Sequence, residues 1–338
     1  MDLNTTWFLL IGVLLTGYAI LDGFDLGVGV LHLFARDEQE RRLHMNAIGP
    51  FWDGNEVWLL AGGGAMFAAF PVLYATVFSG FYLAFMLLLF ALIFRAVSLE
   101  FRSQVDSQGW RRIWDWSFGL GSLLPAVLFG VAVGNVLRGL PIAADGTLNV
   151  SFLALLNPYA ILLGLLSLAM FVMHGAAFLA IKTDGALQQR LARWITGSWM
   201  AFVVIYLIAT VATIFVSPFL FEGILHNPLF WPLFLLLLGG IVYVPVAAAT
   251  GKFPRAFLST AVTIAAMMGL TGISLYPRWV PSSLDLNYSL TIYNASSTPR
   301  TLTNMLIIAL IAMPIVLTYT VYIYRVFRGK VVLTEDNY

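Results

Sequence analysis

The chain has 338 residues, of which 60% are hydrophobic and only 10% are charged. Because soluble domains carry about 25% charged residues, this composition and a mean hydropathy of +0.88 indicate an integral membrane protein with little room for a soluble domain. The net charge of +1 provides no basic field for nucleic acid, and the lack of cysteine excludes disulfides, thiolate metal sites and cysteine-ligated iron–sulfur clusters.

Nine segments are apolar over the roughly 20 residues that a membrane-spanning helix needs. In chain order they cover residues 7–34, 51–74, 77–101, 116–138, 157–182, 191–216, 229–249, 257–277 and 303–328. We expect a tight turn at 71–74 between the second and third. The second is the weakest candidate, because two acids lie at its start and three consecutive glycines interrupt it. The sequence predicts one all-α transmembrane domain over residues 1–338, with nine helices arranged as two four-helix bundles and one peripheral helix.

The basic residues predict an orientation in the membrane. If all nine segments span, 15 of the 18 Lys and Arg residues fall on one side, and only Arg138, Arg278 and Arg300 fall on the other. By the positive-inside rule the N-terminus is then outside and the C-terminus is cytoplasmic. A count that was wrong by one helix would scramble this segregation, so the charges also support nine spans.

Two aspartates, Asp22 and Asp25, lie within the first apolar segment. Their spacing of three residues puts both on one helix face, which continues through Gly29 to His32. Carboxylates are costly in hydrocarbon, so this face is expected to meet protein or water. Three roles are open: a proton relay, a cation site, or a buried network in which one aspartate pairs with an arginine of a neighbouring helix.

Two more acids, Asp53 and Glu56, open the second segment between Trp52 and Trp58. One interpretation is a helix N-cap at Asp53, with Glu56 completing a capping box. The other is the cytoplasmic mouth of a relay at the depth of His32, since a helix start at a membrane surface rarely needs two acids beside tryptophans.

The third segment ends on the same side with Arg95 and Glu100. Arg95 is expected either to form an ion pair with Asp53 or Glu56, or to extend its guanidinium along the apolar helix surface to the lipid headgroups.

The number of histidines disfavours haem ligation by this chain. His44 and His226 are expected in loops, so only His32 and His174 lie near a span. His174 follows Met170 by one turn, and both residue types ligate haem. A single histidine on an apolar helix is nevertheless more typical of a hydrogen-bonded core residue.

A series of motifs runs along the whole chain in order. They are Thr16-Gly17, Asp22 through Gly29, Glu40-Arg41-Arg42, Asn46, Pro50 through Asn55, Val57-Trp58, Phe67 through Pro71, Phe78 through Tyr82, Phe94-Arg95, Phe101-Arg102-Ser103, Trp110-Arg111, Trp114-Asp115-Trp116, Pro281-Ser282-Ser283, Ser289-Leu290-Thr291 and Asn294 through Ser297. Together they resemble subunit II of the cytochrome bd quinol oxidases.

This resemblance implies one subunit of a heterodimeric oxidase in a bacterial inner membrane. The complex would oxidise quinol and reduce oxygen to water with protons from the cytoplasm. Haems b and d would belong to subunit I, so this chain is expected to bind none directly. The resemblance further implies a structural quinone and a small single-helix accessory subunit in some members.

Carried over by position, the resemblance also implies a proton path. Its acids would be Asp22, Asp25, Asp53, Glu56 and Glu100, with the first two deepest and with Asp53 and Glu100 nearer the entrance. A supporting polar network would comprise His32, Asn55, Arg95 and Arg102. No catalytic residue and no metal ligand is expected in this chain.

Two other functions stay open from the residues alone. A proton- or sodium-coupled secondary transporter would use Asp22 and Asp25 as its coupling site, since glycine-interrupted spans and midplane carboxylates suit such proteins. A purely structural assembly subunit would use the acids only for packing.

Overall fold

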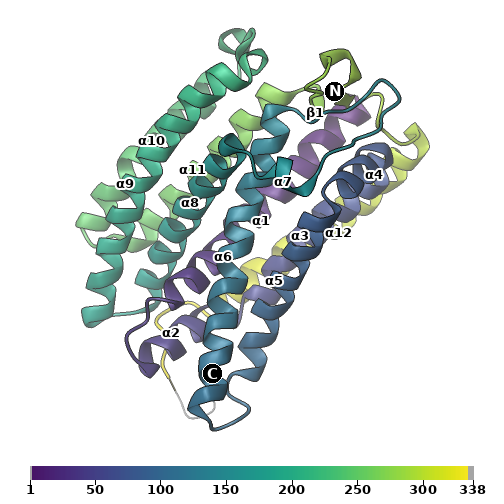
Figure 1. Cartoon of the computed structure of the whole chain (residues 1–338). Helices are drawn as coiled ribbons and strands as arrows, with labels where there is room; N and C mark the ends of the chain where they lie inside the picture. Colours follow the sequence, from purple (N-terminus) through teal and green to yellow (C-terminus); the bar gives the residue numbers. More distant parts are fainter. Residues whose placement is uncertain (1, 334–338) are drawn as a thin grey trace.

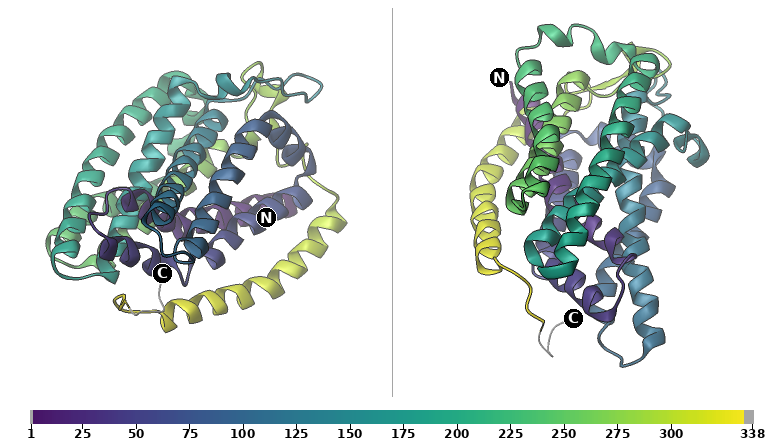
Figure 2. Two further views of the ribbon diagram at one scale, coloured as in Figure 1. Left: turned by 60° about the horizontal axis from the view of Figure 1, so that its bottom comes forward. Right: turned by 90° about the vertical axis from the view of Figure 1, so that its left-hand side faces the viewer.

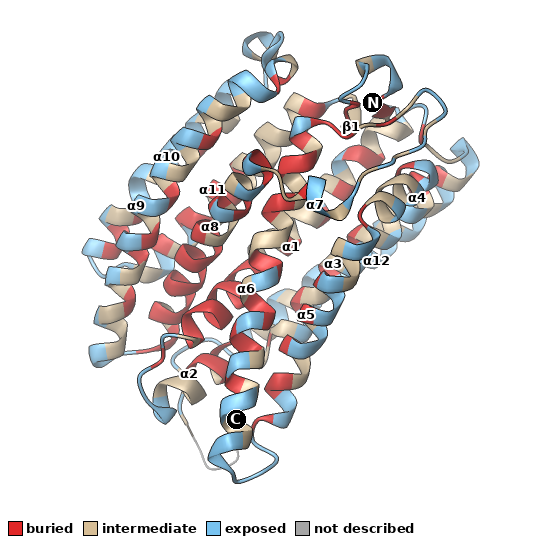
Figure 3. Cartoon of the chain, in the orientation of Figure 1, coloured by how far each residue is buried: buried red, intermediate tan, exposed pale blue. Residues whose placement is uncertain are grey.

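The centre of the fold is a pair of long helices that touch through glycines. The computed structural model describes residues 2–333, and α1 (Leu3–His32) and α8 (Pro158–Lys182) hold many of its buried residues (Figure 1, Figure 3). A Cβ on Gly27 would lie 1.8 Å from the carbonyl oxygen of Phe171, and one on Gly175 would lie 2.6 Å from the backbone of Gly27. Because no side chain fits at this contact, the glycines hold the acidic part of α1 against α8.

The other elements surround this pair. They are α2 (Glu38–Ile48), α3 (Trp52–Ala69), α4 (Pro71–Gly80), α5 (Tyr82–Phe101), α6 (Gln108–Arg138), α7 (Phe152–Leu155), α9 (Gly185–Val216), α10 (Phe230–Ala249), α11 (Phe253–Leu275), α12 (Pro299–Val326), the 3₁₀ helices η1 (Pro218–Phe221), η2 (Ile224–His226) and η3 (Leu286–Tyr288), and the strands β1 (Arg278–Val280) and β2 (Leu290–Thr291).

The predicted all-α membrane fold is confirmed. Within residues 2–333, eight helices are long and apolar enough to span a bilayer, and the bent pair of α3 and α4 makes a ninth span when the two are counted as one. The prediction of nine corresponds to this upper count. The division into two four-helix bundles stays a prediction.

The predicted boundary between the second and third spans is wrong. The helix α3 ends at Ala69, and Pro71 begins α4 instead of a turn, because a residue without an amide hydrogen fits the first turn of a helix. The two helices meet at 119°, and α5 follows from Tyr82. Residues 71–80 therefore form a short separate helix at one end of the bundle (Figure 1).

A helix that the sequence analysis did not predict follows the first span. The segment α2 begins after Asp37, whose carboxylate accepts a hydrogen bond from the amide of Glu40. Its inner face buries His44 and Met45, so the expectation that His44 lies in a loop is wrong. The helix was missed because it is polar overall and too short to span a membrane.

The segment before α12 folds over the end of the bundle where the N-terminus lies (Figure 1). There β1 pairs antiparallel with β2, with Arg278 opposite Thr291. The amide of Ser297 donates to the carbonyl oxygen of Ala69 at 2.8 Å, and the indole of Trp7 donates to the carbonyl oxygen of Leu302 at 2.9 Å. The first bond ties the segment to the end of α3, and the second ties the start of α12 to the start of α1.

The last helix, α12, is the peripheral one. It runs along one edge of the bundle and packs chiefly against α1 and α3 (Figure 2). Its most apolar stretch buries no residue. The polar side chains near its end nevertheless reach the inner helices, as described below.

Candidate functional site

A fully buried arginine, Arg95 of α5, lies at the centre of the site. Its guanidinium donates to both carboxylate oxygens of Asp22 at 2.6 and 3.0 Å and to Glu56 at 3.2 Å. The same guanidinium lies 3.9 Å from Asp25. Close packing of α5 on α6 seals this position, since a Cβ on Gly121 would lie 2.9 Å from the Arg95 amide nitrogen. The predicted ion pair with Glu56 is present, and the alternative that Arg95 extends to the headgroups is wrong.

Three carboxylates surround this single guanidinium. Asp22 and Asp25 are fully buried, and the side chain of Glu56 is 25% exposed. One guanidinium compensates one carboxylate, so two negative charges would remain if all three acids were ionised. Within residues 2–333, Oδ1 of Asp25 makes no hydrogen bond. A buried excess of negative charge is costly, and the cluster is therefore suited to taking up a proton or another small cation.

An amide connects this cluster to the last helix. The Nδ2 atom of Asn55 donates to Oδ2 of Asp25 at 2.8 Å and to the carbonyl oxygen of Leu21 at 3.0 Å. The hydroxyl of Tyr324, from α12, donates to Oδ1 of Asn55 at 3.1 Å. The amide of Asn55 is thus fixed from both sides, and it holds Asp25 in one orientation.

A pocket of about 520 Å³ opens beside these residues. Asp53 and Glu100 lie at its exposed rim, while Asn55 and Tyr324 line it on the inner side. Three of the predicted residues therefore lie together at this pocket: Asp53, Asn55 and Glu100. A fourth, Asp25, is not part of the pocket wall itself and is connected to the pocket by the hydrogen bond from Asn55.

The capping interpretation of Asp53 is wrong. The N-cap position of α3 is occupied by Phe51, and no side chain caps the helix there. Asp53 lies in the first turn and is exposed to the pocket, while Glu56 turns inward to Arg95. The two acids consequently have different environments instead of forming one capping box.

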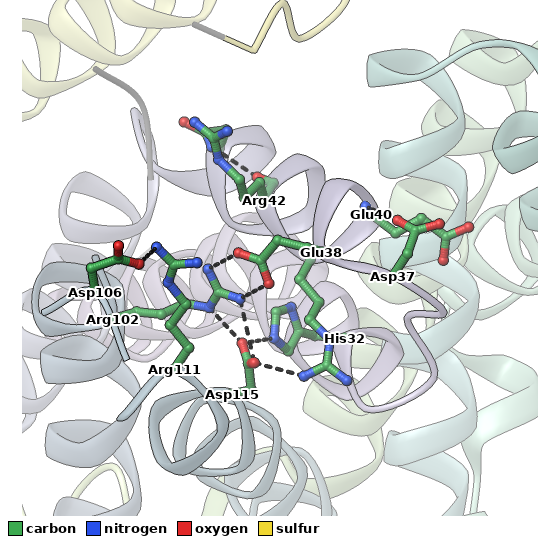
Figure 4. A network of polar contacts seen from close by, with 11 residues as sticks. His32, Asp37, Glu38, Glu40, Arg42, Arg102, Asp106, Arg111 and Asp115 are labelled. Atoms are coloured by element: carbon green, nitrogen blue, oxygen red, sulfur yellow. Dashed lines mark hydrogen bonds and ion pairs between the residues drawn. The ribbon is translucent and has the colours of Figure 1, made fainter. Parts of the chain in front are cut away.

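A second polar network lies at the other end of the acidic stripe of α1 (Figure 4). Its centre is Asp115 of α6, which accepts hydrogen bonds from Arg41 at 2.6 Å and from Arg102 at 2.6 Å and contacts His32 at 2.8 Å. Arg102 also binds the carboxylate of Glu38 with two bonds of 2.9 and 2.8 Å. This network joins α1, α2 and α6 to the end of α5.

His32 and Arg102 were predicted to support the same path as Asp22 and Asp25. Neither contacts those acids in the described part of the chain; both belong to the network of Asp115. Seven residues of helix separate Asp25 from His32, which is about 10 Å along the axis. The shared face was identified correctly, but it serves two separate clusters.

The two other buried histidines, His174 and His44, are core residues. Both ring nitrogens of His174 are engaged, with Thr260 Oγ1 at 2.6 Å and the carbonyl oxygen of Ile20 at 3.0 Å, as the core interpretation predicted. In α2, burial lowers the pKa of His44 well below its usual value. From residue 2 to residue 333, no group of three or more His, Asp or Glu side chains is placed to hold a metal ion.

Sequence reasoning missed Tyr324 and Asp115 as members of these networks. Tyr324 lies in an apolar helix and is 269 positions from its partner Asn55, so no local signal identifies it. Asp115 could have been recognised from the sequence, because it is an acid between two tryptophans at the start of a span, as Asp53 is.

Comparisons with known proteins agree on one family. Residues 3–327 match the family model described as cytochrome bd terminal oxidase subunit II. The chain is similar to cytochrome bd ubiquinol oxidase subunit 2 of Bacillus subtilis, at 39% identity over 98% of this chain and 97% of that protein. It is 35% identical to cytochrome bd-I ubiquinol oxidase subunit 2 of Escherichia coli K12, over 97% of this chain and 95% of that protein.

One solved structure has the same fold. A chain of the bd oxidase from Geobacillus thermodenitrificans superposes with a TM-score of 0.81, over 97% of this chain and 99% of that one. The sequence identity is 16%, so this similarity concerns the arrangement of the helices alone.

Proposed function

Because this chain belongs to the subunit II family of the cytochrome bd terminal oxidases, it is a component of an oxidoreductase complex, and we propose that it provides that complex with a path for protons. The observation that carries this proposal is the buried cluster around Arg95, which meets an open pocket through Asn55. A subunit with only a packing role does not need an open pocket that extends to Asn55, the residue that binds the buried carboxylate of Asp25.

The path begins at the rim of the pocket. Exposed carboxylates at Asp53 and Glu100 raise the local concentration of protons at the mouth. From there water in the pocket carries the proton inward, since an amide such as Asn55 orients its neighbours but does not readily exchange protons with them. The first buried acceptor is Asp25, because its Oδ1 atom makes no hydrogen bond in residues 2–333.

The charge of Arg95 distinguishes the two buried aspartates. Asp22 is held by two hydrogen bonds from the guanidinium, whereas Asp25 lies 3.9 Å away from it. Asp25 is the less compensated of the two carboxylates, and we assign the exchange of the proton to it. Glu56 is the third acid that surrounds the guanidinium, and we include it in the path.

The chemistry of the complex belongs to its partner. We propose a haem-bearing subunit I, with haems b and d, that oxidises quinol and reduces oxygen to water. Of the two histidines near a span, His174 uses both ring nitrogens in hydrogen bonds and His32 uses Nε2 to contact Asp115, which supports placing the haems in the partner. A small single-helix accessory subunit remains a prediction.

A structural quinone has one suitable place in the described residues. An apolar cavity of about 260 Å³ lies between α1, α3, α6, α8 and α11. Tyr18, Ser167 and Thr271 are the polar residues of its wall, and within residues 2–333 the buried hydroxyl of Tyr18 makes no hydrogen bond. Apolar walls suit an isoprenoid chain, and a hydroxyl suits a quinone carbonyl.

Asp25→Asn in the assembled complex tests the path. Asparagine keeps the shape of the side chain but carries no proton, so quinol-driven oxygen consumption should fall on the order of 10- to 100-fold. Absorption spectra of the haems should not change. Asp53→Asn should have a smaller effect, because Glu100 lies at the same rim.

The matched control is Asp106→Asn. Asp106 is a carboxylate outside the pocket whose side chain is 96% exposed, and its replacement should leave turnover unchanged. Normal turnover in Asp25→Asn would contradict the path. A loss of haem together with activity would instead support a structural role, and a chain that purifies without any haem-bearing partner would favour the transporter hypothesis.

A further inference from the structure

A groove lies between α8 and α9, two helices that pack side by side in the bundle (Figure 2). Its volume is about 510 Å³. The walls are apolar, with Leu165 and Val172 from α8 and Ile205 from α9, and the floor is open because Gly197 has no side chain and Ala201 has only a methyl group. No side chain occupies the space above Gly197. The groove is therefore wide enough for one hydrocarbon chain.

The groove ends between two arginines at the start of α9. Arg190 is 14% exposed and forms an ion pair with Glu40 of α2. Arg193 is exposed, and within residues 2–333 it has no hydrogen bond or ion pair. Its charge is thus the uncompensated one at this end. The ring of Trp194 lies beside it, with its centroid 5.1 Å from that of Phe34, and tryptophan is enriched where hydrocarbon meets the headgroups.

The length of the groove matches one leaflet of a bilayer. From Arg193 to Ile205 the helix rises about 18 Å at about 1.5 Å per residue, and half of a hydrocarbon core measures about 15 Å. A chain that lay in the groove would place its headgroup at Arg193 and its end near the bilayer midplane.

We propose that this groove is a binding site for an anionic phospholipid, with one acyl chain between α8 and α9 and the phosphate at Arg193. A guanidinium binds phosphate oxygens with two parallel hydrogen bonds, and basic pockets between membrane helices select anionic headgroups. Glu40 already neutralises Arg190, so Arg193 provides the selectivity for a net negative lipid, while the apolar groove provides affinity for any chain. This site is independent of the proposed proton path.

Native mass spectrometry of the intact complex tests the site. The complex is titrated in detergent with phosphatidylglycerol or with phosphatidylcholine, and the bound lipids are counted. The wild type should retain phosphatidylglycerol at lower concentration than phosphatidylcholine. Arg193→Gln should raise the phosphatidylglycerol midpoint about fivefold, since one basic residue near an anionic headgroup contributes about 1 kcal/mol, and should leave phosphatidylcholine unchanged. Gly197→Leu fills the groove and should abolish retention of both.

Two control variants match these changes elsewhere on the lipid-facing surface. Arg255→Gln removes an exposed arginine from the start of α11, and Gly239→Leu adds a side chain to α10 in open space; neither should change lipid retention. Equal retention of the two lipids by the wild type would overturn the proposal. So would a Gly197→Leu complex that keeps its lipids but loses its partner subunit, because the groove would then be a protein interface.

Discussion

The replacement Arg95→Met tests whether the guanidinium compensates the buried acids. Methionine has a similar length but no charge, so Asp22, Asp25 and Glu56 would remain without a cation. Removing one partner of a buried ion pair costs about 3–5 kcal/mol. With an unfolding entropy of about 2.1 cal/mol/K per residue, 338 residues correspond to about 0.7 kcal/mol/K. The melting temperature should therefore fall by about 4–7 °C when this chain unfolds as its own unit within the complex.

The assay is a thermal melt of the purified complex, followed by size-exclusion chromatography. Adding Asp22→Leu to Arg95→Met removes the acid that the guanidinium binds most closely, and should recover about half of the lost stability or more. Arg95→Lys should restore less, because a lysine cannot form the two parallel bonds to Asp22. Arg255→Met, at an exposed arginine, should change nothing. If Arg95→Met melted like this control, or if the double variant were no more stable than the single one, the charge argument would be refuted.

Three further predictions concern separate contacts. Tyr324→Phe removes the hydrogen bond to Asn55, and should cost about 1 kcal/mol and lower oxygen consumption less than the loss of a path acid does. Burial lowers the pKa of His44 in the folded chain from its usual 6.5, so the unfolded chain binds a proton more readily. The free energy of unfolding of the complex should therefore fall by up to about 1.4 kcal/mol per pH unit below 6.5. His44→Phe should flatten that pH dependence in thermal melts between pH 7 and pH 5. Gly175→Ala puts a methyl group 2.6 Å from the backbone of α1 and should reduce the yield of assembled complex, whereas Gly63→Ala, which points into open space, should not.

The separation of the two polar networks also has a functional consequence. The network of Asp115 joins α1, α2 and α6 to the end of α5 through two carboxylates, two arginines and a histidine. Its charges are balanced more closely than those of the cluster at Arg95, because Asp115 and Glu38 face Arg41 and Arg102. We expect its loss to affect assembly more than turnover.

Most of the site residues were identifiable from the chain, because acids and arginines stand out in apolar segments. Asp22, Asp25, Asp53 and Glu56 were found in this way, and an ion pair of Arg95 with Asp53 or Glu56 was one of the two alternatives for that arginine. The pocket itself was not, because its inner wall includes Tyr324, which resembles any other aromatic residue of a membrane helix.

The sequence by itself determined the class of the protein, the apolar segments, the family and the presence of costly acids within the spans. These properties depend on the hydropathy and order of residues along the chain. Only the tertiary structure decided that Arg95 faces Asp22, that His32 belongs to Asp115, and that Pro71 starts a helix instead of ending one. In a membrane, helices are apolar on nearly all sides, so hydrophobic periodicity does not define their rotation; close contacts between small residues, such as Gly27 and Gly175, decide which side chains meet.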